Sequence, residues 1–467
     1  MSLEESPTET DGADPFDAWR QFFALERDVI VLSLAMFAFS LGFQMTNRYM
    51  AEYMVALGAT GIAVGLFGTF GNVISAVYPY PGGAISDRIG SRYALTAFGF
   101  LATVGFGIWL AAPLLSGIAV GPVELSIVAI FVGLVFAQAW KSFGLGATYA
   151  IVKQAVPPAQ LAAGFASTES FRRTAFLVGP LIAAIIFAPF TGAADDVVLA
   201  FQLILVVAIV FGVLGTLVQH QLYDSSEDSF GKEFEGVAQI KRDLREMPAE
   251  LRPLLVGDTL VRFANGMVYI FFVLVVTDFL AVGLSLPVAL PLVGDSLSPP
   301  AFFGLLLSLE MAVALLVMIP AAKLAERVGL KPIVAMGFLV YAVFPIMLIS
   351  VPEGGIGALT TAGVLALLFA FSGLRFAGLP AHKALIVGPA EMGAGGRVTG
   401  SYYLLRNLIV IPSAALGGVL WEGISNPFTG EELITGDPVL AFSIATVIGL
   451  LGTAYFLLFG KEFEAYK

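Results

Sequence analysis

The chain has 467 residues, of which 58% are hydrophobic and only 13% are charged, and its mean hydropathy is +0.89. Soluble proteins carry about 25% charged residues, so this composition excludes an ordinary soluble protein and indicates a chain that crosses a membrane many times. The net charge is −11 at pH 7, and the absence of cysteine excludes disulfides, thiolate nucleophiles and cysteine metal sites.

Residues 1–28 form an acidic segment that lacks the basic region and apolar run of a cleaved signal peptide. We expect a solvated, disordered tail in the cytoplasm. After this segment, apolar runs long enough to cross about 30 Å of hydrocarbon alternate with polar loops. Twelve such runs occur, at 29–56, 61–85, 92–115, 123–151, 168–190, 197–221, 254–281, 302–325, 332–351, 356–381, 399–423 and 438–460.

One long polar stretch divides these spans into two sets of six. The sets occupy residues 29–222 and 253–460, with a cytoplasmic linker at 223–252 between them and a short tail at 461–467. The linker carries apolar residues at helical spacing over 234–246. This spacing fits either an amphipathic helix on the membrane surface or a mobile linker.

Charge alternates from loop to loop along the spans. Lysine and arginine occur in the loops after even-numbered spans, whereas the loops after odd-numbered spans contain neither and carry acids such as Asp195, Asp295 and Glu432. By the positive-inside rule, the even-numbered loops and both termini are cytoplasmic. We therefore expect a multi-pass protein of the cell membrane.

A cationic phrase follows the second span and occurs again after the eighth. The copies read GAISDRIGSR at 83–92 and AKLAERVGLK at 322–331, and Asp87 and Glu326 are 239 residues apart. A repeat of half the chain length indicates a duplicated unit and two pseudo-symmetric bundles. Gly83 would let helices approach closely, Gly90 would permit a tight turn, and Asp87 would face a helix N-terminus or a cation.

Ionisable side chains inside the spans mark candidate cavity residues, because such groups cost about 3 kcal/mol at the bilayer centre. In the first span, Gln44, Arg48 and Glu52 follow one another at intervals of four and share a helical face, beside Asn47. We expect this stripe to line a substrate cavity. A self-contained pair of Arg48 and Glu52 near the outer interface is the alternative.

Cations recur at equivalent places in the two halves. Lys141 in the fourth span and Arg375 in the tenth are 234 residues apart, as are Arg172 and Arg406 in the fifth and eleventh. Lys141 and Arg375 fit either a cavity wall or snorkelling to lipid headgroups.

The seventh and eighth spans add further candidates. Asp258, Arg262 and Asn265 share one stripe, although the first two, four residues apart, also fit a simple pair. Glu310 lies deep inside the eighth span, where a carboxylate can bind and release a proton as its exposure changes. We expect Glu310 to be a proton-coupling site; a salt bridge or direct substrate contact are the alternatives.

Twelve spans, a central linker and the repeated phrase together resemble the major facilitator superfamily of transporters. The phrase resembles the signature loop G-x-x-x-D-R-x-G-R-R, with Ser91 in place of one arginine and Ala322 in place of a glycine. The resemblance covers residues 28–460. It implies an all-α membrane protein of twelve transmembrane helices in two pseudo-symmetric six-helix bundles, with a solute site between them.

In that family the signature loop locks the cytoplasmic side when the cavity opens outward. The resemblance therefore implies a cytoplasmic gate in both copies, whereas anchoring of the helix ends is the purely structural alternative. The gate residues would be Gly83, Asp87, Arg88, Gly90, Arg92, Glu326, Arg327, Gly329 and Lys331.

Gly179-Pro180 in the fifth span resembles an element common in the superfamily's proton-driven exporters, and Pro412 is a loose counterpart in the eleventh. Proline removes a backbone hydrogen bond and kinks a helix. A kink without mechanistic meaning is the alternative.

The sequence thus predicts a secondary transporter, not an enzyme, that moves a small organic solute by alternating access. Proton-coupled efflux is the first expectation, and uptake or uniport of an organic anion is the alternative. The expected partners are the solute, the proton and the lipid bilayer. No nucleic acid, metal or cofactor is expected, and the protein is expected to be a monomer.

Overall fold

The computed structural model describes residues 27–121, 123–143, 161–223, 245, 247–290, 294–387, 395–425 and 432–462. The acidic tail at 1–26 lies outside these ranges. So does nearly all of the predicted amphipathic helix at 234–246, which stays a prediction.

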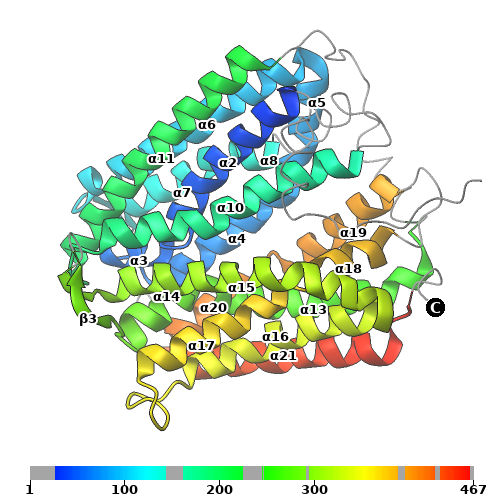
Figure 1. The fold of residues 1–467 in the computed structure, drawn as a ribbon. Coiled ribbons are helices and arrows are strands. Elements are labelled where there is room, and N and C mark those ends of the chain that lie inside the picture. Colours follow the sequence, from blue (N-terminus) through cyan, green and yellow to red (C-terminus); the bar gives the residue numbers. More distant parts are fainter. Residues whose placement is uncertain are drawn as a thin grey trace, which may run out of the picture.

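The first half of the chain forms one bundle of helices, drawn from blue to green in the upper part of Figure 1. Its elements are α2 (Arg27–Asn47), α3 (Met50–Ala56), α4 (Gly61–Val77), α5 (Pro79–Ile89), α6 (Ser91–Ala111), η1 (Ala112–Leu115), α7 (Leu125–Ala137), α8 (Ala139–Phe143), α10 (Leu161–Phe187) and α11 (Ala194–Leu222).

The second half forms a matching bundle in the lower part of Figure 1. Its elements are η3 (Ala249–Leu251), α13 (Arg252–Val268), η4 (Tyr269–Phe271), α14 (Phe272–Leu274), η5 (Val275–Phe279), α15 (Pro299–Val328), α16 (Leu330–Ile349), α17 (Thr361–Gly373), η6 (Leu374–Phe376), α18 (Leu379–Val387), α19 (Gly395–Val410), α20 (Ser413–Glu422) and α21 (Pro438–Phe459).

Ten helical segments of the described chain are long and apolar enough to cross a membrane by length and composition. The second and fifth predicted spans are not among them; they fall on α4, a shorter apolar helix, and on α10. Together these helices account for the twelve predicted spans. The predicted fold class is confirmed.

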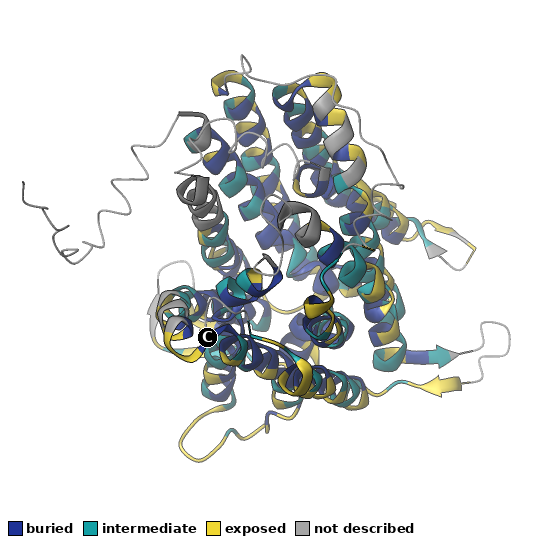
Figure 2. Cartoon of the chain, turned by 90° about the vertical axis from the view of Figure 1, so that its right-hand side faces the viewer, coloured by how far each residue is buried: buried dark blue, intermediate teal, exposed yellow. Residues whose placement is uncertain are grey.

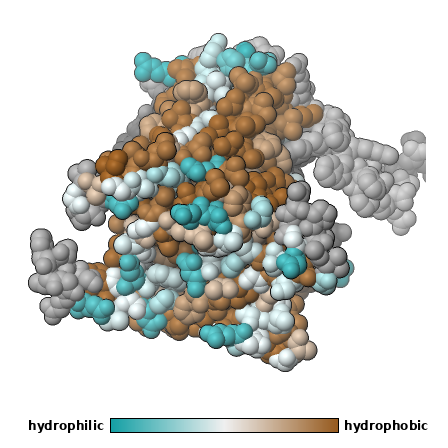
Figure 3. All heavy atoms as spheres, turned by 90° about the vertical axis from the view of Figure 1, so that its left-hand side faces the viewer, coloured by the Kyte–Doolittle hydropathy of each residue, from teal (hydrophilic) through white to brown (hydrophobic). Residues whose placement is uncertain are grey.

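Three short hairpins lie in the loops after odd-numbered spans. They pair β1 (Ala119–Val120) with β2 (Val123–Glu124), β3 (Leu284–Leu290) with β4 (Gly294–Leu297), and β5 (Gly423–Ser425) with β6 (Glu432–Thr435), all antiparallel. We call this end of the molecule the acidic end. In Figure 3, which faces it, hydrophobic residues cover much of the upper bundle and polar residues gather across the middle.

Buried aromatic side chains build the core of the first bundle. The Tyr53 ring stacks on Phe201 with centroids 4.2 Å apart, and its hydroxyl donates to the Trp109 carbonyl at 2.8 Å. Trp109 Nε1 donates in turn to the Ile130 carbonyl at 2.8 Å. Because the polar atoms of these rings are paired, α3, α6, α7 and α11 form a well-satisfied scaffold. Figure 2 shows that buried residues occupy the interior of both bundles.

The two copies of the repeated phrase form the same turn. Gly90 joins α5 to α6 with φ +88°, and Gly329 joins α15 to α16 with φ +91°. Glycine adopts this left-handed conformation without the steric cost that a Cβ brings. The tight turn predicted at Gly90 is therefore confirmed, and the second copy reproduces it. Both turns lie at one end of the molecule, opposite the hairpins, which we call the basic end (Figure 1).

The segment after α21 is attached to the second of these turns. The Glu462 carboxylate accepts hydrogen bonds from the backbone N–H groups of Leu330 at 3.1 Å and Lys331 at 2.9 Å. These are among the N–H groups at the start of α16 that have no partner within the helix. Glu462 therefore caps α16 at the basic end.

The two bundles pack against each other along two lines, α4 against α20 and α10 against α15. Small residues bring the backbones together: a Cβ added to Gly65 would lie 2.9 Å from Gly418 Cα, and one added to Gly304 would lie 2.6 Å from the Pro180 carbonyl oxygen. Both lines therefore depend on close approach of helix backbones.

These contacts lie toward the acidic end. The Glu422 carboxylate accepts a hydrogen bond from the Ile62 N–H of the other bundle at 2.9 Å, and the Thr277 hydroxyl donates to the buried carboxylate of Glu52. Toward the basic end, the described helices of the two bundles diverge (Figure 1). The described helices therefore approach closely at the acidic end and lie apart at the basic end.

Candidate functional site

A cavity of about 310 Å³ lies between the two bundles and is lined by residues of both. The first bundle contributes α2, α4 and the junction of α7 with α8. The second contributes α13, η4, α14, α15, η6, α19 and α20. This volume is at the lower end of the range of about 300–1,000 Å³ for ligand pockets, so it suits a small solute.

Several of the lining spans are interrupted beside the cavity. Arg48 stands between the end of α2 and the start of α3, Gln138 stands between α7 and α8, and Arg375 lies in the 3₁₀ turn η6 between α17 and α18. Irregular backbone inside a membrane is tolerated where it lines a cavity or is covered by protein. The breaks therefore mark the polar centre of the molecule.

Glu310 forms an ion pair with Arg375 in the wall of the second bundle. Arg375 Nη2 lies 2.7 Å from Glu310 Oε1, and the Ser372 hydroxyl donates to the same oxygen. Both charged side chains are 2% exposed. The guanidinium also lies 5.0 Å from the ring centroid of Tyr341 and 4.8 Å from that of Phe376. Each charge is thus neutralised by the other in a setting that excludes most water.

Arg48 reaches from the first bundle toward this pair. Its guanidinium lies 4.6 Å from the ring centroid of Tyr269 in the second bundle, and its Nε donates to Gln44 Oε1 at 3.3 Å. Glu310 and Arg375 are the charged groups that act on it most strongly. Arg48 therefore joins the two bundles across the cavity.

Lys141 lines the cavity from α8. Its ammonium lies 4.2 Å from the ring centroid of Phe43, a cation–π contact. Its charged neighbours among the described residues include two cations, Arg172 and Arg48. The structure thus places Lys141 at the cavity, one of the two locations that its sequence position allowed.

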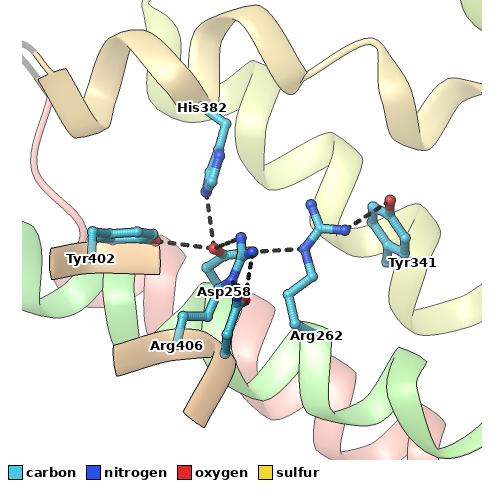
Figure 4. Close-up of polar contacts among 7 residues, drawn as sticks. Asp258, Arg262, Tyr341, His382, Tyr402 and Arg406 are labelled. Atoms are coloured by element: carbon cyan, nitrogen blue, oxygen red, sulfur yellow. Dashed lines mark hydrogen bonds and ion pairs between the residues drawn. The ribbon is translucent and has the colours of Figure 1, made fainter. Parts of the chain in front are cut away.

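A second charged cluster surrounds Asp258 in α13, whose side chain is fully buried (Figure 4). Arg262 Nε lies 3.3 Å from Asp258 Oδ1, and Arg406 Nη1 lies 3.2 Å from Oδ2. The Tyr402 hydroxyl donates to the same Oδ2 at 3.1 Å, and His382 Nε2 lies 3.2 Å from it. One carboxylate therefore ties together α13, α18 and α19.

Neutral polar groups complete the lining. The Ser75 hydroxyl donates to Gln138 Oε1 at 3.2 Å, and the amides of Asn72, Asn265 and Asn407 border the same space. Among the residues in the described ranges, no group of three or more His, Asp or Glu side chains could hold a metal ion.

The structure gathers most of the predicted cavity residues around one space. The lining includes Asn47, Arg48, Lys141, Arg262, Asn265 and Arg375, together with the predicted coupling residue Glu310. Gln44 and Glu52 lie outside it: Gln44 holds Arg48, and Glu52 bonds Thr277 across the acidic-end contact. Asp258 and Arg262 form the pair that their spacing allowed as an alternative, and Arg262 also lines the cavity.

Sequence reasoning missed Tyr402 and His382 as partners of Asp258. For Arg406 the sequence gave a signal, its 234-residue spacing from Arg172. Tyr402 lies four residues before Arg406 and so shares its helical face, which would have been the one local clue.

Side chains at the predicted gate are described only in part. Those of Asp87 and Glu326 lie outside the described residues. Arg88 and Arg327 are exposed at the basic end, and Arg92 Nε donates to the His220 carbonyl at 2.7 Å. Their role as a gate stays a prediction.

The two predicted kink positions differ in the structure. Pro412 stands at the break between α19 and α20. Gly179 and Pro180 lie within the continuous helix α10, where a Cβ added to Gly179 would stand 3.0 Å from Gln44 Cβ. Gly179 therefore allows α10 to pack closely against α2, next to the Gln44–Arg48 contact.

The known proteins to which the chain is similar are transporters. No family model matches the chain. An uncharacterized MFS-type transporter of Methanocaldococcus jannaschii is 20% identical over 406 residues, covering 85% of this chain and 89% of that protein.

Solved structures of transporters share the fold. The nucleoside transporter NupG is 11% identical with a TM-score of 0.69, and covers 93% of this chain and 100% of its own. A bacterial homologue of the iron transporter ferroportin in an inward-facing state is 13% identical, with a TM-score of 0.68 and coverages of 93% and 99%. A POT family transporter in complex with 5-aminolevulinic acid is 14% identical, with a TM-score of 0.65 and coverages of 93% and 96%.

Proposed function

We propose that the protein is a proton-coupled secondary transporter of a small organic solute. The proposal starts from the fold, because the predicted resemblance of the chain to the major facilitator superfamily is confirmed. The observation that carries the proposal is the buried Glu310–Arg375 pair in the wall of a cavity shared by both bundles. A site between two bundles that meet at one end suits alternating access.

The ion pair supplies a means of coupling. A buried carboxylate that loses its cation is neutralised by a proton, because an isolated buried charge costs far more than a neutral acid. Protonation of Glu310 would conversely release Arg375 to bind a solute. Proton binding and solute binding are thus linked through one residue pair.

The direction of coupling depends on the charge of the solute. A solute that binds Glu310 itself would compete with the proton, which gives exchange and the efflux expected first from the sequence. An anionic solute that binds Arg375 would favour protonation of Glu310, so that both ligands bind together and travel together. The cations Arg48 and Lys141 at the same cavity support this second candidate, co-transport of an organic anion.

The basic end, where the described bundles diverge, would be the cytoplasmic side by the positive-inside rule. The acidic-end contacts would then close the outer side in the state described. In this scheme Arg88 and Arg327, exposed at the basic end, would form gate contacts only after the bundles close there.

Glu310→Gln tests the coupling. Purified protein is reconstituted in vesicles loaded with a pH dye, and proton movement is recorded after addition of nucleosides, dipeptides, monocarboxylates, dicarboxylates or phosphate monoesters. Parent protein should move protons with at least one class and accumulate that solute under a pH gradient.

Glu310→Gln should keep solute exchange between equal pools yet lose at least tenfold of the gradient-driven accumulation. Glu432→Gln, on an exposed strand at the acidic end, is the matched control and should behave as the parent. Full accumulation by Glu310→Gln would contradict the assignment of the coupling site, and dependence on a sodium gradient alone would contradict proton coupling.

A further inference from the structure

The charges around the cavity do not balance. Five cations line it, and Glu310 is the one carboxylate among the lining residues. Asp258 stands directly behind the wall and adds a second negative charge. Five cations against two carboxylates leave a surplus of three positive charges, even with His382 neutral. A surplus of this size inside a membrane is costly unless anions enter.

Part of the surplus belongs to the first bundle. Neither Arg48 nor Lys141 forms an ion pair with any residue that the structure describes; Arg48 bonds the neutral amide of Gln44, and Lys141 faces an aromatic ring. Two further cations, Arg172 and Arg48, are electrostatic neighbours of Lys141 in the described part of the chain. These two side chains therefore form a positive subsite on the first bundle.

The rest belongs to the second bundle. Arg262 and Arg406 share the single carboxylate of Asp258, so that one positive charge is left over. Their side chains are 24% and 16% exposed, and both line the cavity. Arg262 uses Nε for Asp258 and Nη1 for the Tyr341 hydroxyl at 3.1 Å, which leaves Nη2 for another acceptor. This pair forms a second positive subsite.

Unused donors lie on Arg375, which shares the Tyr269 ring with Arg48 and the Tyr341 ring with Arg262. Arg375 Nε and Nη1 are buried without a hydrogen-bond partner in the described chain, although Nη2 binds Glu310. Buried charged donors are normally paired, so unpaired ones at a cavity wall indicate a missing acceptor. An acceptor oxygen of a bound solute would supply it.

The residues that line the cavity are less suited to other classes of solute. An amine or a zwitterion needs a free carboxylate, but both carboxylates at this cavity are held by arginines. A neutral solute would leave the surplus charge uncompensated. The small volume, about 310 Å³, also opposes a large anion.

We propose that the solute is a small organic dianion with two separated anionic groups, one bound by Arg48 and Lys141 and the other by Arg262 and Arg406. This proposal rests on the transport function proposed above and specifies its substrate class. Because the two subsites belong to opposite bundles, a solute with one charge at each end would attach to both. A phosphate monoester, which carries its two charges on one group, would fill only one subsite.

A matched ligand series tests the proposal by binding alone. Succinate, its half-amide and its diamide have nearly the same size and shape but carry two, one and no negative charges. Affinities are measured by calorimetry on purified protein at low salt, with malonate, glutarate, adipate and glycerol phosphate as further probes. One diacid of the series should bind at least tenfold more tightly than its half-amide, and more tightly than glycerol phosphate.

A double variant tests the subsite on the first bundle. In the double variant Arg48→Gln with Lys141→Met, the diacid should lose its advantage and bind within about twofold of the half-amide, because the charge that the amide removes no longer has a partner. Arg252→Gln, exposed at the start of α13 away from the cavity lining, is the control and should keep the tenfold preference.

Each outcome decides the proposal. Equal binding of diacid and half-amide by the parent, tighter binding of glycerol phosphate, or no binding of any diacid would overturn it. An unchanged preference in the double variant would overturn the assignment to Arg48 and Lys141. Binding of a diacid without flux would contradict the transport function and leave this site standing, whereas proton-coupled flux of another class without diacid binding would do the reverse.

Discussion

Replacement of Gly65 by leucine should open the acidic end of the protein. Gly65 lies where α4 crosses α20, and an added Cβ would stand 2.9 Å from Gly418 Cα and 3.1 Å from Gly418 N. Carbon atoms in ordinary contact are about 3.5–4.0 Å apart, so the two helices must move apart by roughly 1 Å before the rest of the side chain is placed.

The size of the effect follows from this overlap. Overpacking of a tight contact costs about 1–3 kcal/mol. The cost falls only on the state in which α4 touches α20. Since about 1.4 kcal/mol is a factor of ten, the equilibrium should shift about 5- to 150-fold toward the state that is open at the acidic end.

Pulsed electron paramagnetic resonance between two spin labels measures this shift. The chain has no cysteine, so Ala193→Cys and Leu433→Cys, both exposed in loops of opposite bundles at the acidic end, would carry the only labels. Gly65→Leu should increase the population at longer distance. Gly107→Leu in α6, whose added Cβ meets nothing within 4 Å, is the control and should leave the distribution unchanged.

A variant that elutes and melts like the parent, yet gives the parent's distance distribution, would refute the reasoning. The contact of α4 with α20 would then not be what keeps the acidic end closed.

Two further predictions concern stability, read as the thermal midpoint in detergent by tryptophan fluorescence. Asp258→Asn should destabilise the protein by about 3 kcal/mol, because it leaves the partly buried Arg262 and Arg406 without a counter-charge. Asp295→Asn in an exposed hairpin should leave the midpoint unchanged, and equal midpoints for both variants would count against the role of the cluster. Gly329→Ala should lower the stability by about 1–2 kcal/mol, because a φ of +91° is unfavourable for a residue with a Cβ. Gly354→Ala, where the added Cβ has open space and φ is ordinary, should change the stability little. A midpoint unchanged by Gly329→Ala would show that the turn relaxes.

The sequence predicted the membrane spans, the glycine turns and the contacts between residues one helical turn apart. The length of the apolar runs predicted the membrane spans. The glycine of the repeated phrase predicted the turn at Gly90, and the matching Gly329 forms the same turn. The pairing of Asp258 with Arg262 was predictable because four residues in a helix bring two side chains together. Features of this kind need no knowledge of how the helices pack.

The sequence argument for Glu52 failed to anticipate a break in the helix. It assumed one continuous helix from Gln44 to Glu52, but α2 ends at Asn47 and α3 begins at Met50. Residues on either side of the break no longer share a face, so Arg48 lines the cavity and Glu52 contacts Thr277 at the acidic end. Nothing in the residue pattern alone marks that break.

Pairs far apart in the sequence were also beyond prediction. Glu310 and Arg375 come from different spans, and the distant partners of Asp258 come from two other helices, α18 and α19. Periodicity states which residues share a face of one helix, but not which faces of different helices meet. The sequence therefore favoured a proton site for Glu310, with a salt bridge or substrate contact as alternatives, but it did not identify Arg375 as the partner.

The two hydrogen bonds of Glu462 connect the segment after α21 mechanically to the body of the protein. They fasten the segment after α21 to the first turn of α16, so that a force on the following residues is passed to the loop between the eighth and ninth spans. An affinity tag or fluorescent fusion attached there without a flexible spacer would strain that loop.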